Sequence, residues 1–275
     1  MAITAQDVKR LREITGVGMM DCKKALTEAN GDFDAAIENL RKQGQKVAAK
    51  RADRDATEGA IVTAANDDHT VAVIAEVNSE TDFVARNDDF VSFAKTVVDA
   101  LLANRPADLE AAMNMDLDGQ PLSAALTQMT GKIGEKIDLR RFEIVEADGG
   151  QVIDYIHPGA KLGVLVEMTG NGELAEAGRD VAMQAAAMNP VAATREDVPQ
   201  DIQDKEKEIG REQARAEGKP EQILDKIAEG KLNRYFKDNV LVEQPFVKDS
   251  SMTVQKMLDS KGAGLQRFVR FALGG

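Results

Sequence analysis

The chain has 275 residues, of which 43% are hydrophobic, a single cysteine and a formal net charge of −12 at pH 7. The acidic charge argues against nucleic acid as the main ligand, because phosphate binding needs a basic surface, and the lack of an apolar run of about 20 residues argues against a membrane span. Because one cysteine cannot form an internal disulfide and the first residues do not resemble a signal peptide, we expect a cytoplasmic protein of about two domains.

Residues 1–45 are expected to form a module of three short helices. Thr4 can cap the first helix, the segment 15–18 separates it from the second, and Asp32 can cap the third, which Gly44 should close. The apolar residues expected on the inner face of the first helix are Val8, Leu11 and Ile14. Three helices of this total length are a common size for a small binding module.

Met19 and Met20 open the second of these helices, and two interpretations of them remain open. Methionine can fill irregular gaps in a core. It can equally form an adaptable apolar surface for a partner, because its unbranched side chain takes many shapes.

The basic segment 46–58 is expected to link this module, as a helix with a solvated face, to a core in which one pattern occurs twice. Residues 59–64 and 70–77 should form a β-hairpin, followed by a helix. Residues 152–156 and 162–168 should form a second hairpin, also followed by a helix. Two such units predict a duplicated α+β core in which helices cover one face of each sheet.

Residues 199–236 differ from the rest of the chain because charged residues dominate and the apolar stripe, which includes Ile209 and Ile223, is thin. A Gly218-Lys219-Pro220 break between two such helices predicts a protruding helical hairpin, a coiled-coil arm. The arm could pair with a second copy of the chain or with a partner, or it could remain solvated. It would divide the second core unit, 148–198 and 237–275, and leave 59–147 as the first.

Motifs for chemistry are missing from the sequence. There is no Gly-x-x-x-x-Gly-Lys-[Ser/Thr] phosphate loop. His69, His157 and Cys22 make no set of metal ligands at recognisable spacing, and Cys22 lies on an apolar helix face. His157 begins a tight turn, where an exposed turn residue is expected. The sequence therefore predicts a protein that acts by binding, without a metal or cofactor and not as an enzyme.

The end of the strand at 71–77 is the most informative segment. Its apolar residues alternate, with Val71, Val73, Ala75 and Val77 expected on one side. The chain then passes through polar residues to Phe83, an aromatic at a position expected to be exposed. Phe83 could be a wedge for an apolar pocket of another protein, a burial worth about 1.5–3 kcal/mol, or a core residue of the next helix.

Four segments resemble, in their order along the chain, signatures of the bacterial translation elongation factor Ts family. They are residues 15–26, 76–85, 157–165 and 243–247. The resemblance extends over essentially the whole chain. It implies that the chain is a guanine-nucleotide exchange factor for the GTPase elongation factor Tu and binds no nucleotide itself. The three-helix N-terminal module separately resembles ubiquitin-associated modules.

The resemblance also implies which residues contact the GTPase. The residues expected beside its magnesium and phosphate site, where the ring displaces Mg²⁺, are Thr81, Asp82, Phe83 and Val84. The other contacts implied are Arg12, Met19 and Met20 of the N-terminal module and the turn of His157 and Gly159. The second core unit is implied to hold a further domain of the partner. The alternative is a non-catalytic adaptor that binds through the N-terminal module.

Overall fold

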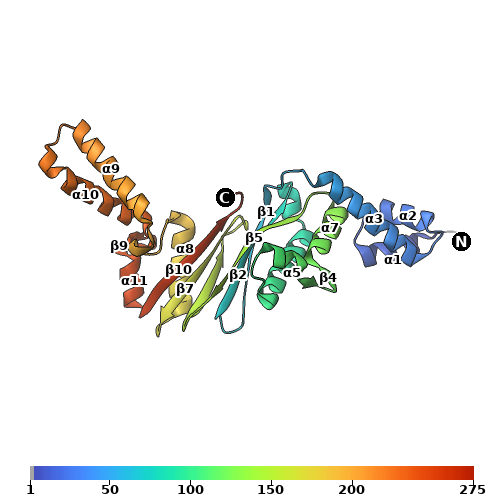
Figure 1. Cartoon of the computed structure of the whole chain (residues 1–275). Helices are drawn as coiled ribbons and strands as arrows, with labels where there is room; N and C mark the ends of the chain where they lie inside the picture. Colours follow the sequence, from blue (N-terminus) through green and yellow to red (C-terminus); the bar gives the residue numbers. More distant parts are fainter. Residues whose placement is uncertain (1–2) are drawn as a thin grey trace. The chain divides into compact units, whose positions relative to one another are not determined.

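A computed structural model describes residues 3–275 and contains both helices and antiparallel sheets, so the predicted α+β class is confirmed (Figure 1). The chain divides into two compact units. The first contains the described residues up to Ala64, together with Val73–Glu143 and Phe271–Gly275. The second contains Ala65–Ala72 and Ile144–Arg270. No helix within residues 3–275 is long and apolar enough to cross a bilayer.

Three helices begin the first unit: α1 (Ala5–Thr15), α2 (Met19–Glu28) and α3 (Phe33–Arg51). The N-terminal caps predicted for α1 and α3 and the break after α1 are present. Thr4 forms a reciprocal capping box with Asp7, Gly16 ends α1 with a left-handed φ of 66°, and Asp32 accepts from the N–H of Ala35. The buried residues of this bundle are Val8, Leu11, Cys22, Ala25, Leu26, Ala36 and Leu40.

The prediction that Gly44 ends the third helix is wrong. Helix α3 continues through it to Arg51 and packs on α7 (Leu122–Ile133). A Cβ built on Gly131 of α7 would lie 2.4 Å from the Cα of Gly44. The missing side chains therefore allow the two helix backbones to touch, which explains a glycine that sequence reasoning assigned to a helix end.

The sheet of the first unit has the order β1-β2-β5, with strands β1 (Glu58–Ala65), β2 (Val71–Ser79) and β5 (Asp138–Glu146). The other elements are α4 (Asp82–Ala85), α5 (Asp88–Asn104), α6 (Leu109–Asn114) and the short strands β3 (Asp116–Leu117) and β4 (Gln120–Pro121). All nine residues of β2 are buried. The expected alternation between a covered and an open face is thus wrong for this strand.

The sheet of the second unit has the order β10-β7-β6, with strands β6 (Gln151–Ile156), β7 (Leu162–Gly170) and β10 (Ala263–Ala272). Strands β6 and β7 pair from Gln151↔Met168 to Ile156↔Gly163. Helix α8 (Leu174–Met188) packs closely against them at Gly178, where an added Cβ would be only 2.6 Å from a side-chain carbon of Ile153.

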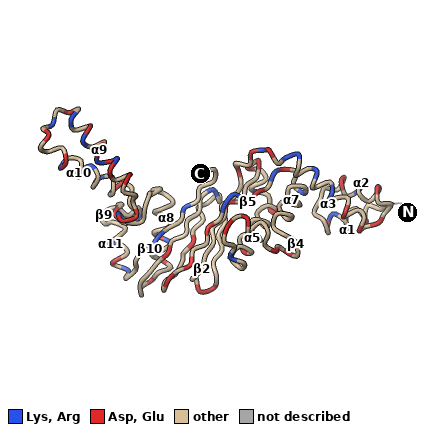
Figure 2. The backbone as a smooth tube through the Cα atoms, viewed as in Figure 1, with Lys and Arg blue, Asp and Glu red and all other residues tan. Residues whose placement is uncertain are grey.

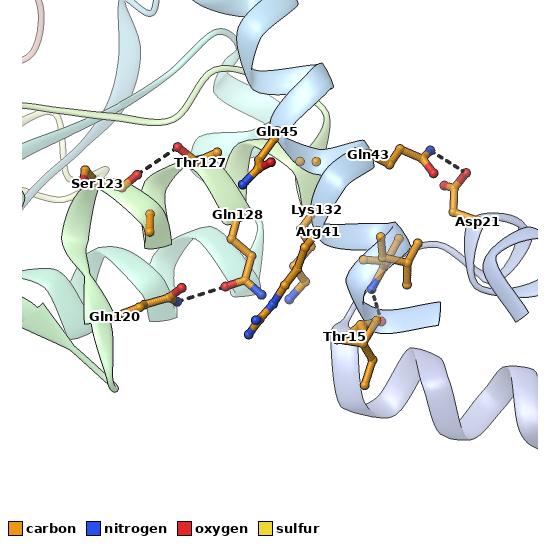
Figure 3. Close-up of a pocket in the computed structure, with 16 residues that line it drawn as sticks. Thr15, Asp21, Arg41, Gln43, Gln45, Gln120, Ser123, Thr127, Gln128 and Lys132 are labelled. Atoms are coloured by element: carbon orange, nitrogen blue, oxygen red, sulfur yellow. Dashed lines mark hydrogen bonds between the residues drawn. The ribbon is translucent and has the colours of Figure 1, made fainter. Parts of the chain in front are cut away.

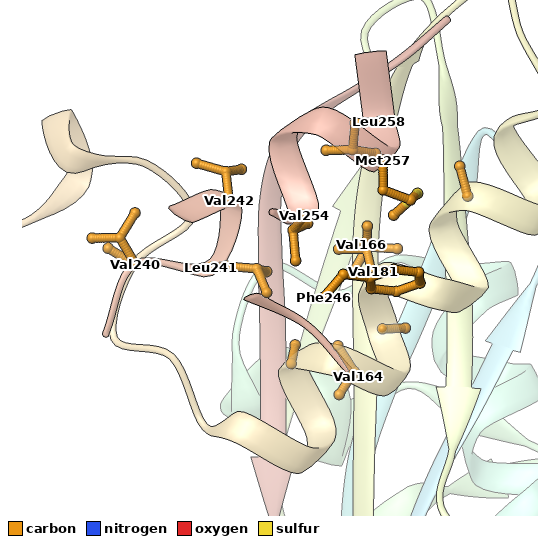
Figure 4. Close-up of a cluster of buried hydrophobic side chains, with 14 of the residues drawn as sticks. Val164, Val166, Val181, Val240, Leu241, Val242, Phe246, Val254, Met257 and Leu258 are labelled. Carbon is orange, nitrogen blue, oxygen red and sulfur yellow. The ribbon is translucent and has the colours of Figure 1, made fainter. Parts of the chain in front are cut away.

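An apolar cluster continues from this sheet into the last third of the chain (Figure 4). Its buried residues come mainly from β6, β7, α8, the 3-10 turn η2 (Leu241–Glu243) and α11 (Val254–Ser260), with single residues of β8 (Pro245–Phe246) and β10 and two from the end of the second arm helix. Strand β9 (Asp249–Thr253) pairs with β8 and adds the partly buried Met252. The buried amide of Gln184 donates to Gln244 and to the carbonyl of Pro245, so polar groups inside the cluster are satisfied.

The arm consists of α9 (Gln200–Ala216) and α10 (Glu221–Asn239), and acidic and basic residues alternate along both (Figure 2). The predicted hairpin is present, but its seam differs. The buried residues are Gly210 and Ala214 of α9 and Leu224, Ala228, Leu232 and Phe236 of α10, while Ile223 is 41% exposed. Small residues let the helices approach closely, since a Cβ on Gly210 would be 3.0 Å from the Cα of Ala228.

Candidate functional site

Phe83 stands on a single helical turn that follows the buried strand β2. Thr81 caps this turn, α4, by accepting from the N–H of Val84, and α4 has no buried residue. Phe83 is 83% exposed, whereas Phe90 on the next helix is fully buried. The interpretation of Phe83 as a core residue is therefore wrong, because Phe90 takes the inward position.

The base of the turn is tied to the segment that follows α7. The carboxylate of Glu135 accepts from the N–H of Thr81 at 3.0 Å and from its hydroxyl at 2.8 Å. The carboxylate of Glu80 accepts from the N–H of Lys136 at 2.7 Å and from Arg51 at 2.7 Å. Asp82 accepts from Arg86 at 2.5 Å within the turn.

These contacts fix the charge state of Glu80. Burial acts to raise its pKa, but the N–H of Lys136 and the guanidinium of Arg51 outweigh burial and hold the pKa of Glu80 below its usual value. The carboxylate is thus ionised at neutral pH and acts only as an acceptor.

A buried carboxylate with a partly exposed arginine partner anchors β2 before it reaches the turn. Glu76 is fully buried and accepts from Arg141 of β5 at 2.8 Å, from the amide of Asn78 and from the N–H of Gly274. Arg141 also donates to the carbonyl of Ala272. The strand that leads to Phe83 is therefore anchored by a carboxylate that accepts hydrogen bonds from three different residues.

The N-terminal module presents an apolar surface at the junction of α1 and α2. Met20 is 75% exposed and Met19 is 42% exposed, so the interpretation of both as core residues is wrong. Arg12 is also exposed, in the last turn of α1. Sequence reasoning placed Ile14 inside, yet it is 57% exposed. Steps of three residues drift backwards around a helix of 3.6 residues per turn, so a Val8–Leu11–Ile14 series leaves the inner face.

His157 and Gly159 lie in the turn between β6 and β7 in the second unit, and both are exposed. The N–H of His157 donates to the carbonyl of Leu162, and Gly159 has a φ of 94° that a side chain would strain. The hydroxyl of Tyr155 lies 3.0 Å from Nδ1 of the imidazole. All other predicted site residues belong to the first unit.

A cavity of about 490 Å³ lies within the first unit, where α3 and the end of α1 face α7 (Figure 3). Its polar lining includes Arg41, Gln128 and Lys132, and Lys132 pairs with Asp89 at 2.9 Å. A Cβ on Gly16 would be 2.3 Å from Cε of Lys132, so the lysine stem crosses the turn between α1 and α2. The cavity includes none of the predicted site residues. Across residues 3–275, no three His, Cys, Asp or Glu side chains are grouped to hold a metal.

The sequence did not identify Glu135 and Arg51 as contacts of the Phe83 turn, and it did not identify Ile14 as an exposed residue. Ile14 could have been found by testing its helical angle. Glu135 and Arg51 carry no local signal, because their partners lie 54 and 29 residues away in the sequence.

Comparisons with known proteins give one consistent result. A family model described as Elongation factor TS matches residues 80–275. The chain is similar to Elongation factor Ts of Prosthecochloris aestuarii, at 49% identity over 99% of both chains, and of Flavobacterium psychrophilum, at 51% over 99% of both. It is also 48% identical to Elongation factor Ts of Amoebophilus asiaticus over 100% of both.

Proposed function

The chain belongs to the elongation factor Ts family, and we propose that its function, guanine-nucleotide exchange on elongation factor Tu, depends on the turn from Thr81 to Val84. It binds elongation factor Tu with GDP and promotes GDP release during translation elongation. The observation that carries the proposed site is Phe83, an aromatic ring 83% exposed on a braced turn.

Phe83 acts as a wedge. Its ring enters an apolar pocket of the GTPase beside the magnesium and phosphate site, and the turn brings Asp82 with it. Bound Mg²⁺ offsets much of the charge of the GDP phosphates, so displacement of the metal weakens GDP binding. Because coupling between two ligands is reciprocal, GDP must weaken binding of the factor by the same free energy, typically about 1–3 kcal/mol.

Two further surfaces hold the partner in place. The exposed Met19 and Met20 on α2 and the exposed Arg12 on α1 support a docking surface for the nucleotide domain. The exposed turn of His157 and Gly159 supports a second contact, and the second unit grips a further domain. Exchange by this mechanism makes and breaks no covalent bond. The protein therefore accelerates GDP release by binding the GTPase and is not an enzyme in the chemical sense.

The core is proposed to be an internal duplication. In each unit a hairpin is followed by a helix and then by a strand that adds beside the second hairpin strand. The second hairpin strand of each unit, β2 or β7, also carries a buried glutamate as its sixth residue. An arginine of the added strand pairs with it: Arg141 with Glu76 and Arg267 with Glu167. Such a pair is costly to bury without its partner, so its recurrence supports the duplication.

The proposed boundaries follow from this division. The ubiquitin-associated-like module is 1–45, the basic linker 46–58, the first core unit 59–147, and the second 148–198 with 237–275. The arm, 199–236, is proposed as a homodimer contact, supported by Ile223, a large apolar residue that is exposed on α10.

GDP release from purified elongation factor Tu, followed with a fluorescent GDP, tests the function. Addition of the wild-type chain should greatly accelerate release. A double variant of Asp82→Ala and Phe83→Ala should still bind the GTPase in a pull-down but lose most of this acceleration. If the protein were an adaptor acting through its N-terminal module, neither chain would accelerate release and both would bind equally.

A further inference from the structure

The turn that carries Phe83 is held by a pair of crossed contacts, which we call the clasp, made by Glu80, Thr81, Glu135 and Lys136. The side chain of Glu135 accepts from the backbone of Thr81, and the side chain of Glu80 accepts from the backbone of Lys136. Each segment thus offers a carboxylate to the other's main chain. The turn cannot shift along its neighbour unless both charge-assisted contacts break.

Thr81 joins the clasp to the helical turn itself. Its hydroxyl donates to Glu135 and accepts from the N–H of Val84, which is 3.4 Å away. A hydroxyl has one proton, so donation to Glu135 leaves its lone pairs free to face Val84. Hydrogen bonds in such a chain strengthen one another.

The turn needs this support because it is very short. Helix α4 has four residues, and none of them is buried. One isolated helical turn is unstable by itself, since nucleation fixes several dihedral angles for one hydrogen bond. The place and direction of the Phe83 ring are therefore set by the cap at Thr81 and by whatever holds that cap.

Arg51 extends the clasp to the N-terminal helices. It is the last residue of α3, and its guanidinium lies 2.7 Å from the same Glu80 carboxylate that accepts from Lys136. One carboxylate thereby connects α3, the base of the Phe83 turn and the segment after α7.

We propose that Glu135 is a positioning residue for nucleotide exchange, which acts through Thr81 to hold Phe83 in the orientation that enters the partner. This inference rests on the proposed function. A wedge that is already ordered loses less conformational entropy when it enters a pocket, so loss of the clasp weakens the effect of Phe83 without removing the ring.

The test measures release of fluorescent GDP from elongation factor Tu at saturating concentrations of each full-length variant. Glu135→Ala should lower the stimulated rate about tenfold, equivalent to about 1.4 kcal/mol. The matched control is Glu110→Ala, an exposed glutamate on α6, which should keep the wild-type rate. Thr81→Val loses the hydroxyl that joins Glu135 to the cap and should slow release as Glu135→Ala does.

A double-mutant cycle separates positioning from a general structural defect. In the Phe83→Ala background, the added Glu135→Ala change should lower the rate by less than about twofold, because its effect passes through the ring. An equal loss in both backgrounds would overturn the proposal, and so would a wild-type rate for Glu135→Ala alone. Failure of the wild-type chain to accelerate release would instead refute the proposed function.

Discussion

We expect Phe83→Ala to slow nucleotide exchange strongly while leaving the factor's own stability almost unchanged. The ring is 83% exposed and α4 has no buried residue, so its removal takes little from the factor's own packing. Surface substitutions of this kind usually change the free energy of unfolding by no more than about 0.5 kcal/mol.

The expected loss of exchange follows from the exposed fraction of the ring. Complete burial of a phenylalanine side chain stabilises by about 1.5–3 kcal/mol. Because 83% of the residue's surface is free to be covered by a partner, the contact is worth about 1.2–2.5 kcal/mol. This free energy corresponds to a rate of GDP release lower by about 8- to 70-fold at equal factor concentration.

Stopped-flow release of fluorescent GDP measures the rate, and urea denaturation measures stability. Val91→Ala is the matched control, because Val91 is an apolar residue on α5 that is 48% exposed. The control should stay within about twofold of wild type. Unchanged release with Phe83→Ala would refute the wedge, and a fall in stability above about 1 kcal/mol would show that the ring packs on its own chain.

Three further predictions concern the stability of the fold. Gly131→Ala should destabilise the fold by about 1–3 kcal/mol in urea denaturation, because the new Cβ would meet the backbone of Gly44 at 2.4 Å. The control Gly230→Ala has nothing within 4 Å of its new Cβ and should stabilise α10 by about 0.5–1 kcal/mol. Equal effects of the two changes would contradict the close approach of α3 and α7. Glu80→Gln should cost stability at neutral pH, because a carboxyl whose folded pKa is lowered stabilises fully above the ordinary value near 4.5. That cost should shrink as the pH falls from this value through the folded pKa of Glu80, and a pH-independent difference in unfolding free energy would exclude this linkage. Arg141→Met should destabilise the fold by about 3 kcal/mol, because the fully buried Glu76 carboxylate loses this arginine partner. A compensating Glu76→Gln change should restore part of that loss. No recovery in the double variant would argue that the two residues stabilise the fold through other contacts.

Local sequence signals determined the elements of this fold. The capping residues Thr4 and Asp32, the left-handed Gly16 and the Gly218-Lys219-Pro220 break all act over a few residues, so they could be recognised without the tertiary structure. The family signatures indicated the function in the same way. Errors arose where one residue type serves two purposes: Gly44 resembled a helix end and instead permits contact with α7.

The candidate site shows the same division. The sequence identified Phe83 as a candidate but left open whether its ring lies in the core or in solvent, because an aromatic residue beside a helix fits either position. Only the tertiary structure decided this, by placing Phe90 in the core and Phe83 in solvent. The sequence also contained no sign of the clasp, whose partners Thr81 and Glu135 are 54 residues apart. Periodicity and capping describe neighbours along the chain, whereas the contacts that orient the wedge form only when distant segments meet.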